Sequence, residues 1–181
     1  MPPDISDAPI EEVIRRRRST RRFDGRPIAR HQLEALLAAA MSPIPGDAFE
    51  PLPVEPFLIV NAVEGLEPGL YGPDLGLIRR GVLRREAGEL ALGQELAAEA
   101  AVNVYFLSDL AAVFERLGER GYRVAQMAGG IAGERLELSA TELGLGATGL
   151  TFFDDLVTAL FEPASAGRQV MYLAVVGQRP S

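Results

Sequence analysis

The 181-residue chain contains no cysteine and no lysine. Without cysteine it can form no disulfide, thiolate nucleophile, iron–sulfur cluster or zinc–thiolate site. Without lysine it has neither the amine that holds pyridoxal phosphate as a Schiff base nor the lysine of a Walker-type phosphate loop. All 18 basic residues are therefore arginines, whose forked donors suit carboxylate and phosphate groups. Pyridoxal enzymes and Walker-type nucleotidases are excluded.

A single histidine, His31, leaves little imidazole for catalysis or metal binding. A transition-metal site would need carboxylates almost alone, and the sequence shows no acidic cluster with ligand spacing. His31 lies in PIARHQLEALLAAA, whose apolar spacing predicts an amphipathic helix. We expect this histidine on the surface of that helix rather than in a Ser–His–Asp triad.

Long apolar runs are absent as well, since no stretch approaches the ~20 residues that a membrane-spanning helix needs. The opening MPPDISDAPIEE lacks the basic and apolar regions of a secretory signal. We therefore expect a cytoplasmic protein with no membrane partner. Hydrophobic residues make up 48% and charged residues 24%, which is typical of globular proteins, and the length predicts one domain over residues 1–181.

The predicted elements begin with helices and continue with strands and helices in mixed order. Helices are expected at about residues 9–17, 30–41, 82–100, 109–118, 122–143 and 154–161. Strands are expected in VEPFLIVNA, AVNVYFLSDL and QVMYLAVVG, with a hairpin or paired turns in GLYGPDLGLIRRG and an extended segment in LGATGLTFF. Because strict strand–helix alternation is missing, this order favours an α+β fold with an antiparallel or mixed sheet.

The longest predicted helix contains three glycines within five residues, Gly129, Gly130 and Gly133. Each interior glycine costs up to ~1 kcal/mol of helix stability relative to alanine, so the three need a reason. Close approach of another backbone or of a flat ligand would supply one. The alternative is that the helix breaks there.

Residues 15–22 read RRRRSTRR, six arginines in eight positions of a chain whose formal net charge is −7. On a helix Arg17 and Arg21 would lie one turn apart, and in an extended segment Arg17, Ser19 and Arg21 would share one face. Either arrangement can bring two guanidinium groups and a hydroxyl to one anion, such as a flavin or nucleotide phosphate. A solvated helix end is the alternative. The pI of about 4.8 argues against a nucleic-acid partner, which needs a broadly basic surface.

The segment IEEVIRRRRSTRRF, followed by HQLEALLAAA, resembles the opening of the nitroreductase superfamily of flavin enzymes. In that family an Arg-x-Ser-x-Arg/Lys pattern holds the phosphate and ring edge of FMN. Here it falls on Arg17, Ser19 and Arg21, with Arg18 inside the pattern. VEGLEPGLYGPD and ERGYRVAQMAGGIAGERLELSATELGLGATGLTFFDD resemble the branch with the dehydrogenases that oxidise azolines in ribosomal peptide maturation. The resemblance covers about residues 10–177.

The resemblance implies an α+β sandwich that forms a homodimer through its long central helices, with two FMN molecules at the interface. The dimer contact would explain the small residues of the central helix. GATGLTFF would pass flavin N5, with Gly149 and Leu150 offering backbone contacts. Ser42 stands where the family often has a Pro-Ser loop near the isoalloxazine, and Arg179 is a further phosphate candidate. The implied activity is an FMN-dependent oxidoreductase with ping-pong hydride transfer between NAD(P)H or an organic donor and an acceptor.

Three departures from the azoline-oxidase pattern bear on the reaction. Arg116 and Leu117 replace a Lys-Tyr pair implicated in proton transfer, and neither side chain can act as a general base. Gly130 replaces a histidine, and SPIPGDAFEPLP replaces the Asn-x-Gln-Pro-Trp loop of ordinary nitroreductases. Azoline oxidation in its usual form is therefore not expected. A catalytically silent dimer, with or without flavin, that acts as a scaffold for a peptide-modifying system is the alternative.

No dedicated proton donor can be identified from the sequence, and no catalytic residue is assigned. Tyr71 and Tyr122 are hydroxyl candidates by residue type, although a buried ring with a satisfied hydroxyl is the expected state of each. Reduction of a nitro compound or a quinone could instead draw its protons from water.

Overall fold

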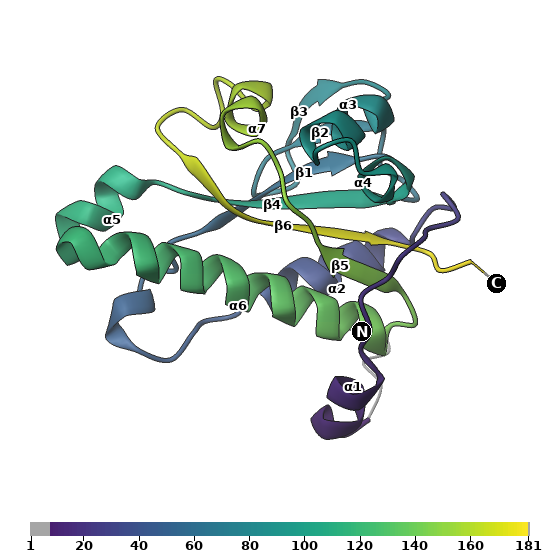
Figure 1. Cartoon of the computed structure of the whole chain (residues 1–181), viewed down its shortest axis with the longest axis horizontal. Coiled ribbons are helices and arrows are strands. Elements are labelled where there is room, and N and C mark those ends of the chain that lie inside the picture. Colours follow the sequence, from purple (N-terminus) through teal and green to yellow (C-terminus); the bar gives the residue numbers. More distant parts are fainter. Residues whose placement is uncertain (1–7, 181) are drawn as a thin grey trace.

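The protein is built on a six-stranded sheet flanked by helices, as seen in a computed structural model that describes residues 8–180 (Figure 1). The strand order is β3-β2-β1-β4-β6-β5. The strands are β1 (Glu55–Val60), β2 (Gly69–Tyr71), β3 (Leu77–Arg80), β4 (Val102–Ser108), β5 (Gly146–Gly149) and β6 (Gln169–Gly177). All neighbouring strands pair antiparallel, which confirms the predicted α+β class and the hairpin of β2 and β3.

Helices cover both faces of this sheet. They are α1 (Ile10–Arg16), α2 (Arg30–Ala40), α3 (Arg84–Leu90), α4 (Glu95–Glu99), α5 (Leu110–Leu117), α6 (Gly121–Glu142) and α7 (Asp154–Leu160). Two short 3₁₀ turns, η1 (Asp47–Phe49) and η2 (Gly118–Arg120), complete the set in the described range. Helices α2 and α6 lie against one face, while α3, α4 and α7 lie against the other (Figure 1). No helix in residues 8–180 is long and apolar enough to span a membrane.

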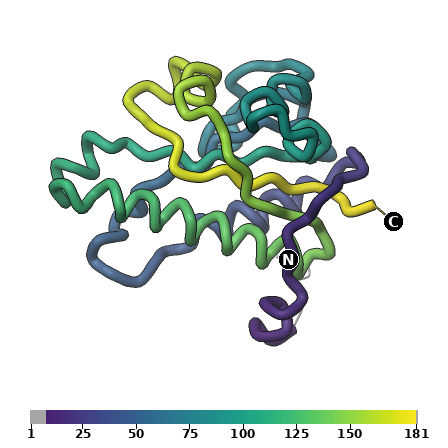
Figure 2. Tube along the Cα trace, viewed as in Figure 1, coloured from purple at the N-terminus to yellow at the C-terminus, as the bar shows by residue number. Residues whose placement is uncertain are grey.

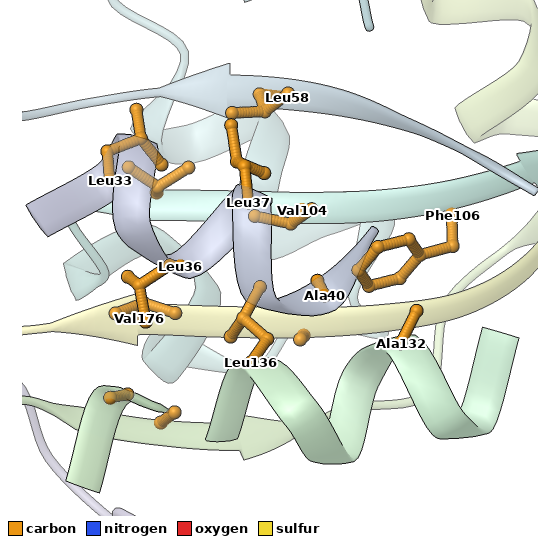
Figure 3. Close-up of a cluster of buried hydrophobic side chains, with 14 of the residues drawn as sticks. Leu33, Leu36, Leu37, Ala40, Leu58, Val104, Phe106, Ala132, Leu136 and Val176 are labelled. Atoms are coloured by element: carbon orange, nitrogen blue, oxygen red, sulfur yellow. The ribbon is translucent and has the colours of Figure 1, made fainter. Parts of the chain in front are cut away.

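The larger hydrophobic core lies between α2, α6 and the sheet (Figure 3). Leu33, Leu36, Leu37 and Ala40 recur at helical spacing on α2 and are all buried. Full burial of each leucine contributes roughly 1.5–3 kcal/mol relative to its exposed state. On the same helix His31 points to solvent, as predicted.

The predicted helix over residues 82–100 is wrong as a single element. The structure divides it into α3 and α4, separated by Leu92 with φ 57° and Gly93 with φ 75°. The amide of Gly93 turns back to donate to the carbonyl oxygen of Gly88, which closes α3. Composition rich in alanine, leucine and glutamate indicated helix correctly, but the glycine at the end of α3 limits its length.

The glycines of α6 do not break the helix, which is continuous. A Cβ added to Gly129 would lie 3.0 Å from Met171 Cβ, and one added to Gly133 would lie 2.2 Å from Tyr172 Cε1. These two glycines therefore admit side chains of β6 from the same chain, and this packing accounts for them without a contact between subunits. Gly130 faces open space, with nothing within 4 Å of an added Cβ.

The proline-rich loop over residues 42–53 is fastened by two arginines. Arg116 of α5 donates to the carbonyl oxygens of Ala48 and Glu50, the former at 2.9 Å from Nη2. Arg135 of α6 donates to the carbonyl oxygens of Ser42 and Pro43. Figure 2 shows the loop in blue beside the joined ends of α5 and α6. The arginine that replaces the family lysine thus has a structural task here.

Exchange of Gly133 for alanine tests the packing of α6 on β6. We expect Gly133→Ala to destabilise the protein by about 1–3 kcal/mol, because the new methyl group collides with the ring of Tyr172. The matched control, Gly130→Ala, has free space and should stabilise the helix by up to ~1 kcal/mol. Chemical denaturation of both variants measures the difference, and equal stabilities would contradict the contact.

Exchange of Arg116 for alanine tests the loop attachment. Loss of its bonds to Ala48 and Glu50 should release the loop, so that limited proteolysis cuts within residues 42–53 several times faster. Arg85→Ala, an exposed arginine of α3 paired only with Glu89 among the described residues, is the control and should leave that rate unchanged. Cleavage at the same rate in all three proteins would show that Arg116 does not hold the loop.

Candidate functional site

The arginine-rich segment crosses the edge of the sheet after α1 ends at Arg16. The amide of Thr20 donates to the carbonyl oxygen of Ala147 in the edge strand β5, with 3.0 Å between nitrogen and oxygen. Further on, the amide of Asp24 donates to the carbonyl oxygen of Gln178 beyond β6. In Figure 2 this purple segment passes the yellow end of the chain. Two backbone bonds therefore attach the segment to β5 and to the end of β6.

A hollow of about 360 Å³, which we call the arginine hollow, opens beside this crossing. Its lining consists of Arg18, Ser19, Thr20, Arg21, Arg22, Arg179 and Pro180. Within residues 8–180, the guanidinium groups of Arg21, Arg22 and Arg179 form no ion pair with a carboxylate. Guanidinium groups without a carboxylate partner among the described residues therefore gather around one hollow in a chain of net charge −7, an arrangement suited to an anion.

Arg17 and Arg18 of the run both have partners outside the hollow. Arg18 lines the hollow but donates from Nη1 to the carbonyl oxygens of Arg15 and Arg17, at 2.6 and 2.8 Å, and so caps the end of α1. Arg17 turns towards α6, where its Nη1 lies 3.1 Å from Glu137 Oε2 and its Nε 3.3 Å from Glu134 Oε1. The structure brings Ser19 and Arg21 together with Arg18 and Arg179, whereas Arg17 does not line the hollow.

Strand β5 leads from the arginine hollow to Gly149 along the open edge of the sheet. A Cβ on Gly146 would lie 2.6 Å from Thr20 Oγ1, so a glycine here allows the arginine segment to come close. Because the carbonyl of Ala147 faces outward to Thr20, the alternation of an antiparallel ladder turns the backbone of Gly149 outward as well. The amide of Leu150 points inward and donates to Leu173, with 3.1 Å between nitrogen and oxygen.

Ser42 forms no hydrogen bond with the described residues of the arginine hollow. It follows α2, its hydroxyl donates to the carbonyl oxygen of Ala38 at 2.9 Å, and it does not line the arginine hollow. A role for Ser42 beside a bound group therefore stays a prediction.

Glu137 and Tyr172 form a pair behind β5 that sequence reasoning missed. Glu137 is 5% exposed, and the hydroxyl of Tyr172 donates to its Oε1 at 3.4 Å. Burial, together with the neighbouring charge of Glu134, raises the pKa of Glu137, while Arg17 opposes the shift. Burial and the carboxylate of Glu137 raise the pKa of Tyr172 to about 12. Only the glycines that make room for Tyr172 signal this pair in the sequence.

The two tyrosines singled out from the sequence lie elsewhere. Tyr71 of β2 is buried and donates to the carbonyl oxygen of Glu67 at 2.7 Å, as expected. Tyr122 is 47% exposed at the start of α6, so the expectation of a buried ring is wrong there. The described residues also contain no group of three or more histidine or acidic side chains able to hold a metal ion.

Comparison with known proteins agrees with this architecture. The model of the nitroreductase family matches residues 14–177. A protein of Methanocaldococcus jannaschii, MJ1384, provisionally described as a nitroreductase, is 31% identical in an alignment of 166 positions that covers 84% of this chain and 83% of that protein.

Solved structures with this fold include proteins described as nitroreductases or oxidoreductases. A provisionally described nitroreductase from Anabaena variabilis superposes with a TM-score of 0.84 at 35% identity, over 94% of this chain and 38% of that one. This chain thus spans about two fifths of that protein's length. The NADPH:FMN oxidoreductase of Vibrio harveyi, solved with NAD+, gives a TM-score of 0.66 at 16% identity over 95% of this chain and 69% of that one, which shows the fold alone. The family match extends over most of the chain and through both the arginine segment and the sheet, so this chain belongs to the nitroreductase family.

Proposed function

We propose that the protein is an FMN-dependent oxidoreductase that passes two electrons from NADH or NADPH to a small acceptor such as a quinone or a nitro compound. The observation that carries this proposal is the arginine hollow, where three guanidinium groups without carboxylate partners in the described chain surround one space. The family membership supports flavin chemistry in general, and the hollow supports a phosphate-bearing flavin in particular.

The residues present fit FMN. Arg21, Arg22 and Arg179 would offset the charge of its phosphate, and the hydroxyl of Ser19 would donate to a phosphate oxygen. The three residue steps from Gly146 to Gly149 cover roughly 10 Å of extended strand, a distance that a ribityl chain can bridge. The outward-facing backbone of Gly149 would then meet the ring. FMN supplies the two-electron transfer chemistry when it is bound, and the chain supplies binding and orientation.

A homodimer is part of the proposal. Helix α1 buries only Val13, while Ile10 and Ile14 are 54% and 55% exposed. Isolated apolar side chains are common at surfaces, but here they recur on one short helix that projects from the body (Figure 1). A second copy that covers α1 would also bring its own Ser42 and proline-rich loop to this chain's flavin.

The unpaired arginines favour this function over a cofactor-free scaffold. A scaffold needs no anion site, and mutually repelling guanidinium groups destabilise a fold unless an anion offsets them. Azoline oxidation of the usual kind is not proposed, because Arg116 carries out a structural task in place of the lysine.

The spectrum of the purified protein tests the proposal directly. We expect a yellow protein that releases about one FMN per chain on denaturation, because each chain has one arginine hollow that would hold its phosphate group. Anaerobic NADH or NADPH should bleach it, and a quinone should restore the colour. A colourless dimer that neither binds added FMN nor gains thermal stability from it would leave the scaffold as the explanation.

Exchange of Arg21 for alanine tests the phosphate contact. Loss of a charge-assisted hydrogen bond is worth about 1.5–3 kcal/mol, so the Kd for FMN should rise about 10- to 100-fold. The control is Arg30→Ala, an exposed arginine of α2 that pairs with Glu34, and it should leave the Kd unchanged. Fluorescence titration of the flavin-free proteins gives both values, and equal Kd values for Arg21→Ala and wild type would remove Arg21 from the site.

A further inference from the structure

The ring of Tyr172 occupies a space that two glycines from distant parts of the chain leave open. A Cβ on Gly133 of α6 would lie 2.2 Å from its Cε1, and a Cβ on Gly149 of β5 would lie 2.3 Å from its hydroxyl oxygen. Any other residue at either position would displace the ring. Tyr172 is therefore fitted so that its hydroxyl reaches the backbone of Gly149, at the end of the edge strand.

Glu137 is the acidic residue that contacts this hydroxyl. The Tyr172 hydroxyl donates to Glu137 Oε1 at 3.4 Å, and Arg17 binds the other carboxylate oxygen at 3.1 Å. The charged and titratable groups around Glu137 are Arg17 at the end of α1, Glu134 on α6 and Tyr172 on β6. A buried carboxyl and a hydroxyl thus form a short chain that ends beside Gly149.

We propose that Tyr172 and Glu137 are a proton relay, in which the Tyr172 hydroxyl gives a proton to the reduced acceptor and Glu137 restores it. The inference rests on the proposed function, because that function places the acceptor near Gly149. It names the proton donor that the sequence did not reveal. Tyr71 belongs to a strand four positions away in the sheet order, and Tyr122 to the opposite end of α6, so neither hydroxyl reaches this point.

The relay balances protons against the electrons that reduced nicotinamide supplies. A quinone that receives a hydride equivalent from reduced nicotinamide needs one further proton, and the O–H bond that takes up this proton forms while the O–H bond of Tyr172 breaks. A nitro group consumes the same hydride equivalent and proton, and the oxygen that it loses leaves as water. The resulting phenolate takes the proton of the Glu137 carboxyl, so a second O–H bond breaks as the hydroxyl of Tyr172 forms again. Glu137 regains a proton from water, which reaches it past the partly exposed side chain of Arg17.

Burial favours this use of Glu137. The raised pKa of its carboxyl keeps a larger fraction protonated near neutral pH than an ordinary glutamate has. Arg17 opposes that shift and stabilises the carboxylate left after the proton has moved. The surroundings of Glu137 can therefore accommodate both the protonated and the ionised carboxyl.

Two acceptors with different needs test the relay in the flavin-loaded protein. A benzoquinone takes two electrons and protons, whereas ferricyanide takes electrons alone. In rapid-mixing experiments on the reduced protein, Tyr172→Phe should slow reoxidation by the quinone about 100-fold, within the range of a lost general acid, and leave ferricyanide unchanged. The phenylalanine keeps the ring, so the space beside Gly133 stays filled.

Variants of α6 provide the matched comparison. Glu137→Gln should also slow the quinone reaction selectively and remove its pH dependence, because an amide cannot supply the proton. Glu134→Gln removes a charge that raises the pKa of Glu137 but does not contact Tyr172, so it should slow the quinone reaction much less than Glu137→Gln does and leave ferricyanide unchanged. Tyr122→Phe, at the exposed end of the helix, should react with both acceptors within about twofold of wild type.

A readout on the flavin-free protein checks the carboxyl itself. Because the pKa of Glu137 is raised in the folded state, its contribution to stability is present below the ordinary glutamate pKa. That contribution is lost as the pH rises towards the raised value. Thermal unfolding of wild type should show this loss, Glu137→Gln should lack it, and Glu134→Gln should retain part of it. Identical pH profiles of wild type and Glu137→Gln would overturn the role of Glu137.

The outcomes separate the relay from the proposed function. If wild type binds no FMN, the proposed function fails and the relay fails with it. If wild type reduces the quinone and Tyr172→Phe does so equally fast, only the relay is overturned. Equal slowing of both acceptors in Tyr172→Phe would also overturn it, because a purely structural effect does not distinguish them.

Discussion

The ion pair between Arg17 and Glu137 determines the path of the arginine-rich segment after α1. It connects the end of α1 to the buried side of α6, with 3.1 Å between the charged atoms. Because the chain is anchored there, the residues that follow must leave along the outer edge of β5, where Thr20 binds the backbone of Ala147. Removal of one partner of such a pair leaves a poorly solvated charge. The anion site and the Tyr172 pair both depend on this single anchor.

Local pattern was enough for most of the fold and for part of the site. Apolar spacing and strand composition predicted most elements, since both are properties of neighbouring residues. The density of arginine also drew attention to the segment that lines the arginine hollow. The direction of Arg17 was not predictable, because it depends on Glu137, which lies 120 positions away in the chain. Tyr172 was missed for the same reason, since its environment exists only after α6, β5 and β6 have packed.

The departures from the azoline-oxidase pattern are consistent with one another. Arg116 holds the proline-rich loop by its carbonyl groups, so a residue that would transfer protons in that branch serves to fix a loop here. Gly130, in place of the histidine, leaves open space on α6. The proton donor proposed here, Tyr172, lies instead on β6. In the sequence alone, these substitutions suggest a catalytically silent protein. In the folded chain they are equally compatible with an active site that uses other residues.

The course of the arginine segment also affects how the sheet ends. An edge strand with free backbone groups is a template for a strand of another molecule, and charged side chains along it discourage such pairing. Thr20 covers β5 at Ala147, and the arginines on either side surround that edge with positive charge. The opposite edge strand, β3, carries Arg79 and Arg80. The residues suited to hold an anion therefore also discourage a strand of another molecule from pairing with β5, and both edges of the sheet carry arginine.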